Sequence, residues 1–312
     1  MTKEYPNIQK SLVSAIKLPV ILLATFWTIA IVMWQTKGEI FFLFNFGYIG
    51  TSIAIGVGVY TFLPKKKKPI GRKIALFLVG LYMLGFLGVI SSENMQLEGF
   101  FFYCLAGVFQ AAAIHYAVAK IAGPLIFNRG WCGWACWTIM VLDLLPYTRS
   151  PGRVNRKWEW LRYLHFLLSL LLVLVLWYVF DIRSQTESTQ FYWLLIGNVF
   201  YFGLGIALAI ILRDNRAFCK YVCPITVLMK VSARFAMLKI DGDADKCDEC
   251  DACVRMCPMD IRIPEYIKNG ERVLSTECVF CNTCVNVCPK NALGSSFKFD
   301  VGGKELLRRQ HN

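Results

Sequence analysis

The stretch CDECDACVRMCP, residues 247–258, decides how the C-terminal part of the chain folds, and CVFCNTCVNVCP, residues 278–289, repeats its spacing. Each run places three cysteines with two residues between neighbours, then a fourth cysteine after three more residues, directly before a proline. This spacing is typical of 4Fe-4S ligation, in which three thiolates wrap one face of a cubane and the fourth reaches a second cluster. Zinc sites with four cysteines show two separated Cys-x2-Cys pairs instead. The runs therefore predict two 4Fe-4S clusters rather than two zinc sites.

The crossed arrangement assigns four cysteines to each cluster. The first cluster would be held by Cys247, Cys250, Cys253 and Cys288. The second cluster would be held by Cys278, Cys281, Cys284 and Cys257. Residues 239–312 are expected to form a small α+β ferredoxin domain of the bacterial two-cluster type with a short tail. Between the two runs, Lys268–Glu271 is expected to form a hairpin turn.

The remaining residues, 1–238, have the composition of a membrane protein. The whole sequence is 56% hydrophobic and only 18% charged, whereas average soluble domains are about 25% charged. Six apolar runs are long enough, or nearly so, to cross a bilayer as helices. They are Leu18–Trp34, Phe41–Leu63, Ile74–Ile90, Phe100–Phe127, Leu164–Phe180 and Phe191–Leu212. The sequence thus predicts a polytopic α-helical membrane domain, and the absence of Asp and Glu from these runs argues against cation pumping.

The charged residues set the expected orientation. Residues 1–238 carry 23 Lys and Arg against 9 Asp and Glu, whereas residues 239–312 carry 11 against 12. Twenty of the 23 lie in the N-terminus and in alternate loops, and only Lys37 and Arg183 lie in the other loops. The positive-inside rule therefore predicts a multi-pass protein of the cytoplasmic membrane, with both termini and the ferredoxin domain in the cytoplasm. Topology and membrane lipids at Lys65–Lys68 explain the basic residues, so nucleic acid is not expected as a partner.

An internal repeat lies at the expected cytoplasmic edge of the membrane domain. NRGWCGWACW, residues 128–137, aligns without gaps with NRAFCKYVCP, residues 215–224. Each copy follows a helical hairpin and precedes an amphipathic stretch, 138–145 or 225–238, that is expected to lie in the membrane interface. Residues 74–145 and 164–238 are therefore predicted to be a duplicated unit.

Both copies contain a Cys-x3-Cys motif, a spacing that puts two thiols one turn apart on one helical face. Pseudo-symmetric packing of the copies would bring together Cys132, Cys136, Cys219 and Cys223. Four thiolates suit a further cluster, a zinc ion or an exchangeable dithiol pair, and burial as packing residues is the alternative. The remaining cysteine, Cys104, is expected to be a small buried hydrophobic residue.

Duplicated hairpins with Cys-x3-Cys motifs, followed by a two-cluster ferredoxin run, resemble the membrane-bound 4Fe-4S polyferredoxins of the NapH and MauN type, which are related to NosR and CcoG. The resemblance covers residues 74–292. It implies an integral-membrane electron carrier that takes electrons from the quinol pool and passes them to a partner redox protein. The second motif ends in Cys223-Pro224 as in that family, whereas Trp137 follows the first motif.

The leading hypothesis is therefore electron transfer between the quinone pool and a redox partner, with quinol oxidation as the associated reaction and no catalytic residue. Two alternatives stay open: a redox-sensing or metalloenzyme-maturation protein that uses the Cys-x3-Cys pairs, and a subunit of an ion-translocating oxidoreductase. His165, near the start of the fifth span, is the candidate quinone contact, and helix capping or headgroup contact are its alternatives. A haem shared with His115 is disfavoured, because the two histidines differ in depth by about 10 Å.

Overall fold

The computed structural model describes residues 8–109, 111–182 and 187–310. The chain divides into two compact units. Unit 1 comprises Met1–Leu81 and Trp134–Trp137, and unit 2 comprises Tyr82–Gly133 and Thr138–Asn312. Arg183, which entered the charge argument, lies outside the described residues.

Five helices in the described ranges are long and apolar enough to cross a membrane. They are Ala15–Lys37, Ile40–Phe62, Lys68–Ile90, Arg156–Tyr178 and Thr189–Leu212. Each coincides with one of the predicted spans, which confirms a polytopic helical membrane domain.

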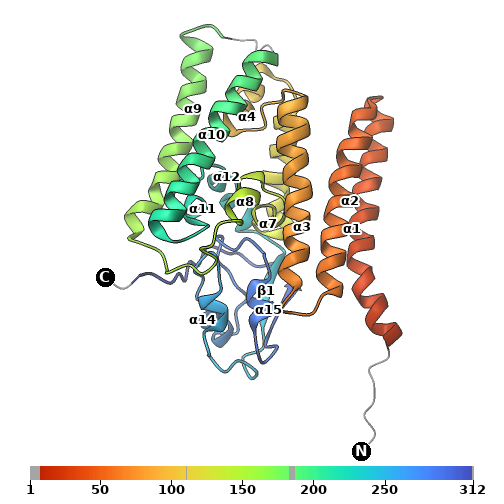
Figure 1. The fold of residues 1–312 in the computed structure, drawn as a ribbon, viewed down its shortest axis with the longest axis vertical. Helices are drawn as coiled ribbons and strands as arrows, with labels where there is room; N and C mark the ends of the chain where they lie inside the picture. Colours follow the sequence, from red (N-terminus) through yellow and green to blue (C-terminus); the bar gives the residue numbers. More distant parts are fainter. Residues whose placement is uncertain (1–7, 110, 183–186, 311–312) are drawn as a thin grey trace, which may run out of the picture. The chain divides into compact units, whose positions relative to one another are not determined.

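Unit 1 is a layer of apolar helices, α1 (Ile8–Lys37), α2 (Ile40–Phe62) and α3 (Lys68–Leu81), in which α2 packs against both of its neighbours (Figure 1). The contact between α2 and α3 is close because it is lined by glycine. A Cβ atom on Gly56 would lie 2.4 Å from the Cβ of Ala75, so no larger residue fits there. Small residues of this kind let apolar helices approach each other in a membrane, where hydrophobic burial does not drive association.

The prediction of Phe100–Phe127 as one continuous span is wrong. After η1 (Tyr82–Ile90), a π-helix that continues α3, the chain forms α4 (Leu97–Ala106) and then reverses. Gly107 ends α4 with φ +67°, a left-handed conformation that glycine adopts without a steric penalty. The rings of Phe100 and Tyr116 then stack 4.7 Å apart, so α4 and the following helices form a tight hairpin. The apolar run continues through this turn, which hides it in the sequence.

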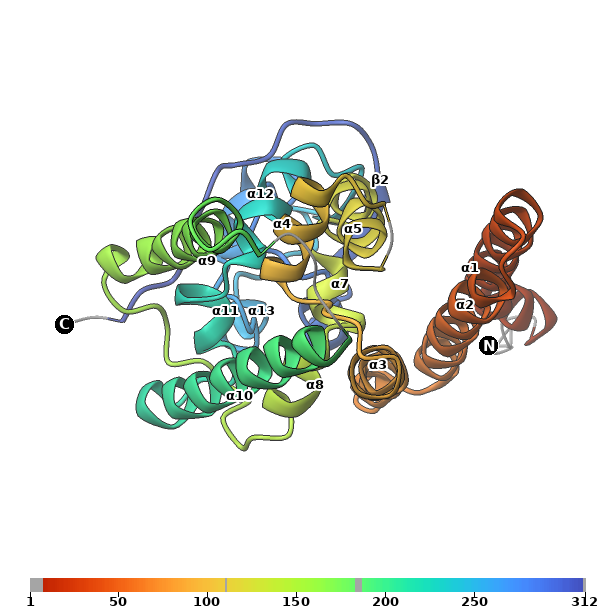
Figure 2. The same ribbon diagram turned by 90° about the horizontal axis from the view of Figure 1, so that it is seen from above.

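The returning arm of this hairpin is one apolar helix, Ala112–Phe127, which is shorter than the five spans. It contains α5 (Ala111–His115), the π-helix η2 (Tyr116–Ala122) and α6 (Gly123–Phe127). The second repeat instead has two long helices, α9 (Leu161–Tyr178), which follows the 3-10 turn η3 (Arg156–Trp160), and α10 (Glu187–Leu212). In unit 2, α4 packs against α9 (Figure 2).

Both repeat motifs fold alike. The first copy forms α7 (Gly130–Trp134) and α8 (Trp137–Leu142), and the second forms α11 (Ala217–Tyr221) and α12 (Ile225–Ala233). In each copy the first short helix begins two residues after the aligned asparagine. The duplication predicted from the sequence is therefore also a duplication of local structure.

The C-terminal part of unit 2 is the predicted small α+β domain. Strands β1 (Leu238–Gly242) and β2 (Leu293–Phe297) pair antiparallel, with Ile240 opposite Ser295. Between them lie α13 (Ala252–Arg255), α14 (Ile263–Lys268) and α15 (Thr283–Val287). Figure 1 shows these elements together at one end of unit 2.

The turn at Lys268–Glu271 exists, but it does not join two strands as predicted. It ends α14, which starts with Pro264 in its first turn. Gly270 has φ +66°, and the amides of Gly270 and Glu271 donate to the carbonyls of Ile267 and Tyr266. An Asn-Gly pair serves a helix C-terminus as well as a hairpin, because both need a left-handed residue.

Candidate metal centre

Two pockets in the ferredoxin domain collect the eight predicted cluster ligands. The first pocket is lined by Cys247, Cys250, Cys253 and Cys288. The second pocket is lined by Cys257, Cys278, Cys281 and Cys284. Each pocket thus combines three cysteines of one run with the fourth cysteine of the other, which is the grouping that crossed ligation requires. Ile263 lines both pockets and so lies between them.

The backbones of the two runs adopt the same unusual conformation. Left-handed residues recur at equivalent positions, with φ between +47° and +59°. These pairs are Glu249 and Phe280, Asp251 and Asn282, and Asp260 and Asn291. A non-glycine residue in this region costs about 1–2 kcal/mol, so six such residues mark loops shaped for a ligand rather than for stability. The amides of Ile261 and Ala292 also occupy matching places, donating to the sulfurs of Cys257 (3.4 Å) and Cys288 (3.3 Å).

The chemistry of these thiols fits a cluster. Burial raises the pKa of Cys257 to about 11, and it raises those of Cys253 and Cys278 to about 12. Buried thiolates therefore need a positively charged partner, which iron supplies. No three His, Cys, Asp or Glu side chains in the described ranges converge on a position that one metal ion could occupy. Four more widely spaced cysteines around a pocket suit a cubane better than zinc.

The repeat cysteines are arranged differently from the prediction of two thiols on one helical face. Cys132 in α7 and Cys219 in α11 are buried within their short helices. Cys136 and Cys223 follow the ends of those helices, in the breaks before α8 and α12. Cys136 belongs to unit 1, whereas Cys132, Cys219 and Cys223 belong to unit 2.

Arg129 is a buried cation that interacts electrostatically with the three repeat cysteines of unit 2. Burial acts to lower the pKa of its guanidinium, but Glu277 and then Cys132, Cys219 and Cys223 hold that pKa above its ordinary value. The Nη1 atom of Arg129 lies 2.9 Å from Glu277, while its Nε and Nη2 atoms make no hydrogen bond within the described part of the chain. Buried donors are normally paired, so unpaired donors beside three thiols fit an anionic group at this place.

The first motif also lies against the second pocket. A Cβ atom on Gly133 would come within 2.3 Å of the carbonyl oxygen of Val279, which stands between two cysteines of that pocket. Arg216 donates to the carbonyl of Cys132 (3.0 Å) and pairs with Asp143 (3.0 Å). The pKa of Arg216 is raised by Asp143, Cys219, Cys281 and Cys132 in turn, against the effect of burial. Arg216 therefore interacts electrostatically with repeat cysteines and with Cys281 of the second pocket.

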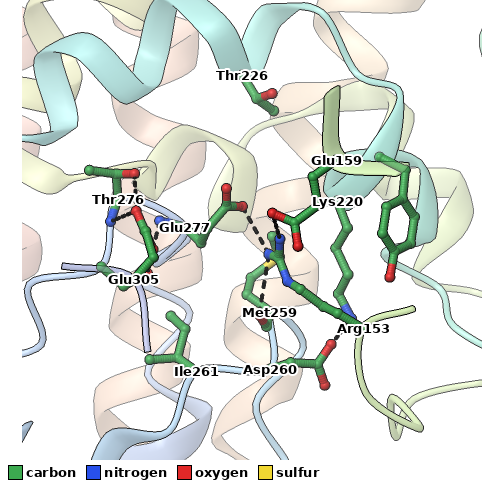
Figure 3. Close-up of polar contacts among 12 residues, drawn as sticks. Arg153, Glu159, Lys220, Thr226, Met259, Asp260, Ile261, Thr276, Glu277 and Glu305 are labelled. Atoms are coloured by element: carbon green, nitrogen blue, oxygen red, sulfur yellow. Dashed lines mark hydrogen bonds and ion pairs between the residues drawn. The ribbon is translucent and has the colours of Figure 1, made fainter. Parts of the chain in front are cut away.

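Glu277, directly before Cys278, is the centre of a buried charge cluster, and Figure 3 shows it with one of its partners, Arg153. We call this group, with the four cations around its carboxylate, the Glu277 cluster. These cations are Arg129 (2.9 Å), Arg153 (3.0 Å), Arg162 (2.8 Å) and Lys230 (2.7 Å). Burial alone would raise the pKa of Glu277, but Arg153, Arg162 and the other cations hold it well below its ordinary value. The cluster ties the ferredoxin domain to the loops of both repeats.

A second buried group of charged residues lies beside the first cysteine run, residues 247–258, through Asp260. Lys220 pairs with Asp260, as Figure 3 shows, and with Asp214 (2.6 Å). Arg308 also pairs with Asp260 (3.0 Å). The side chain of Lys220 is 0% exposed, so its two pairs are shielded from solvent, whereas Arg308 is 27% exposed. The sequence did not predict either buried charge group. The one sequence feature that points to buried charge near the motifs is the repeated Asn-Arg pair, whose arginines are Arg129 and Arg216.

The two histidines lie in different surroundings. The Nδ1 atom of His165 is 2.9 Å from the carbonyl oxygen of Val222, the residue before Cys223, and its ring packs on Phe200 and Tyr201. His115 instead packs on Trp131 at 5.1 Å. His165 therefore lies beside the second repeat motif. Cys104 is exposed on α4, so the prediction that it is buried is wrong.

A carboxylate outside the predicted spans lies among the apolar helices. Glu98 sits in the first turn of α4 and accepts a 2.6 Å hydrogen bond from Ser169 in the middle of α9. The predicted fourth span began after Glu98, so this residue was assigned to a loop. The broken helix brings it against a helix that is long enough to span the membrane.

The sequence matches two families of iron-sulfur domains. Residues 239–289 match the 4Fe-4S dicluster domain. Residues 112–158 and 196–240 both match the 4Fe-4S binding domain, once in each repeat. No solved structure gives a significant match.

The chain also has relatives that match between about half and two thirds of its length. Uncharacterized protein MJ0749 of Methanocaldococcus jannaschii is 28% identical, over 61% of this chain and 76% of its own length. Ferredoxin-type protein NapH of Haemophilus influenzae is 27% identical, over 62% of this chain and 69% of its own length. Methylamine utilization ferredoxin-type protein MauN of Paracoccus denitrificans is 27% identical, over 49% and 57%. The resemblance to NapH- and MauN-type ferredoxin proteins is thereby confirmed, and the chain is an integral membrane protein with iron-sulfur domains for electron transfer.

Proposed function

We propose that the chain passes electrons between the membrane quinone pool and a partner redox protein, through two 4Fe-4S clusters with crossed ligation. The observation that carries this proposal is the pair of pockets, each lined by three cysteines of one run and one of the other. Bound there, each cluster would accept and release one electron, while the protein holds the clusters close together and limits their contact with water.

The repeat cysteines extend this path toward the membrane. We infer that Cys132, Cys219 and Cys223, the three repeat cysteines of unit 2, hold a third metal or cluster site, for which the sequence predicts Cys136 as a further ligand. The unpaired donors of Arg129 and the matches to the 4Fe-4S binding domain around both motifs support this assignment. His165 lies next to the same motif through Val222, which makes it our candidate for the quinone contact.

We propose from the charge distribution that both termini and the ferredoxin domain face the cytoplasm. This orientation needs an even number of crossings, and we propose that the shorter apolar helix Ala112–Phe127 supplies the sixth. A reporter inserted at Lys66 should be active in the cytoplasm, and one inserted after Asp181, between α9 and α10, should be active outside. Reporters with the opposite pattern would reverse the proposed topology.

The first test is chemical. Anaerobically purified protein should contain at least about eight iron and eight acid-labile sulfide per chain, because two cubanes require that number. About four iron or fewer after full reconstitution would contradict the two-cluster assignment.

The second test addresses the quinone pool and the third site together. A menaquinol analogue should reduce the clusters of the wild-type protein, and the Cys219→Ser, Cys223→Ser double variant should keep both ferredoxin clusters but be reduced more slowly. Cys104→Ser is the matched control, since Cys104 lies outside every predicted ligand set. Failure of the wild type to be reduced would contradict quinol coupling. Unchanged kinetics and metal content in the double variant would leave the repeat cysteines with a structural role.

A second candidate function, a subunit of an ion-translocating oxidoreductase, is favoured by one observation. Glu98 places a carboxylate against the apolar helix α9. Ionisable side chains at such positions are rare and are commonly functional.

A further inference from the structure

We propose that the Glu277 cluster raises the reduction potential of the second cluster, the one predicted at Cys257, Cys278, Cys281 and Cys284. The inference rests on the proposed function, since it requires two clusters with crossed ligation. Reduction adds one electron, and therefore one negative charge, to a cluster. Nearby positive charge stabilises the reduced form, and nearby negative charge stabilises the oxidised form.

The Glu277 cluster keeps a net positive charge. Four cations face Glu277, and one of them, Arg153, also lies 3.6 Å from Glu159. Glu159 also pairs with the more exposed Arg309 (3.1 Å), so five cations meet two carboxylates. The arginines are buried, with side-chain exposure of 0% for Arg129 and Arg153 and 1% for Arg162. Buried charges act through an effective dielectric constant of about 20, against about 80 in water, so this excess charge is weakly screened.

This charge lies next to the second pocket. Glu277 and Cys278 are neighbours in the chain, and the backbone amide of Arg129 donates to the carbonyl of Cys278 at 3.2 Å. The neighbouring Lys220 and Arg308 face the carboxylates of Asp214 and Asp260, so that group adds little net charge.

The first pocket has a different electrostatic setting. Asp248 and Asp251 line it, and Glu249 stands between them. The basic partner of Glu249 is Lys268, at 3.3 Å, and both side chains are more than half exposed. Charges on the surface are screened by salt over about 10 Å, so they influence the first cluster less than buried charges influence the second. Burial would by itself disfavour the reduced form of the second cluster, and the Glu277 cluster opposes that effect.

The test is a redox titration of the reconstituted full-length protein, followed by electron paramagnetic resonance. Cys257→Ser identifies the signal of the second cluster, because Cys257 is predicted to be its ligand. Lys230→Gln removes one cation at the rim of the Glu277 cluster and should lower the midpoint potential of that signal. Glu277→Gln removes the central negative charge and should raise it. The matched control Lys268→Gln removes a cation beside the first pocket and should leave the second midpoint unchanged.

The opposite signs of the two shifts distinguish an electrostatic effect from general damage, which would move both variants in one direction. If Glu277→Gln fails to fold, Lys230→Gln still decides, since Lys230 is partly exposed and its loss leaves three arginines in place. Shifts of one sign, no shift, or a shift confined to the first cluster would overturn the inference. An iron content that shows one cluster, or a single redox signal in the wild type, would instead contradict the proposed function.

Discussion

The two copies of the repeat share a motif but not its partners. In the second copy, Arg216 of the Asn-Arg pair binds back to the first copy, at the carbonyl of Cys132 and at Asp143. In the first copy, Arg129 binds the ferredoxin domain, at Glu277. The residue after the first cysteine of each motif also differs, Gly133 in one copy and Lys220 in the other. Because the ferredoxin domain is present once, two similar motifs have acquired different contacts with it.

The membrane helices of the two copies differ as well. The second copy has the long helices α9 and α10. The first copy contains the π-helices η1 and η2 and the short hairpin that starts with α4. Broken and π-helical segments are frequent at functional sites in membrane proteins. Substitutions in the irregular first copy and at its contact with the second pocket should therefore change the iron content and function, whereas substitutions at the buried charges of the second copy should mainly change stability.

The largest effect is expected from Lys220→Met, which removes the cation peculiar to the second copy. The change leaves Asp214 and Asp260 buried with one cation fewer, and breaking a buried pair in this way costs about 3–5 kcal/mol of folding free energy. A thermal unfolding assay of the purified protein should show a large loss of stability. Lys304→Met is the control, because its pair with Glu271 is exposed and worth about 0–1 kcal/mol. Equal effects of the two variants would show that the buried group is not structural.

A smaller but more local effect is expected from Gly133→Ala, which alters the contact peculiar to the first copy. Alanine usually favours a helix by about 1 kcal/mol over glycine. Here its Cβ atom would collide with the carbonyl of Val279, and overpacking costs about 1–3 kcal/mol. The iron content should therefore fall at the second cluster. Gly203→Ala in α10 is the control, since nothing lies within 4 Å of its Cβ position. A variant with full iron content would show that the first motif does not support that cluster.

The sequence predicted those parts of the fold that depend on local patterns. Five of the apolar runs form long helices in the structure. The repeat at residues 128–137 and 215–224 folds into matching short helices. The turn at Gly107 was missed because a helical hairpin inside one apolar run changes neither its charge nor its length. The turn at Gly270 was assigned to the wrong element because one left-handed residue serves helix ends and hairpins alike.

The candidate site divides in the same way. The two ligand sets are predicted from spacing alone, because cluster geometry fixes the sequence separation of its thiols, and the cysteines of each set line one pocket. The Glu277 cluster could not be predicted, since Glu277 and its four cations are separated by between 47 and 148 residues in the chain. Each of these residues, taken singly, looks like an ordinary surface charge or a topology signal. Only the packing of the repeat loops on the ferredoxin domain brings them together.

The smallest effect on stability is expected from Glu98→Gln, and it tests whether the irregular first copy carries protons. Glutamine has the same size and accepts the hydrogen bond from Ser169, so unfolding should change by less than about 0.5 kcal/mol. Glutamine cannot take up a proton, however. If the chain couples electron transfer to ion movement, proton uptake by liposomes containing the variant should fall, while reduction of its clusters by dithionite stays at the wild-type level. Ser169→Ala, which keeps the carboxylate, should retain the uptake. Equal proton uptake by Glu98→Gln and wild-type protein would assign Glu98 a structural role and favour a simple electron carrier over an ion-translocating subunit.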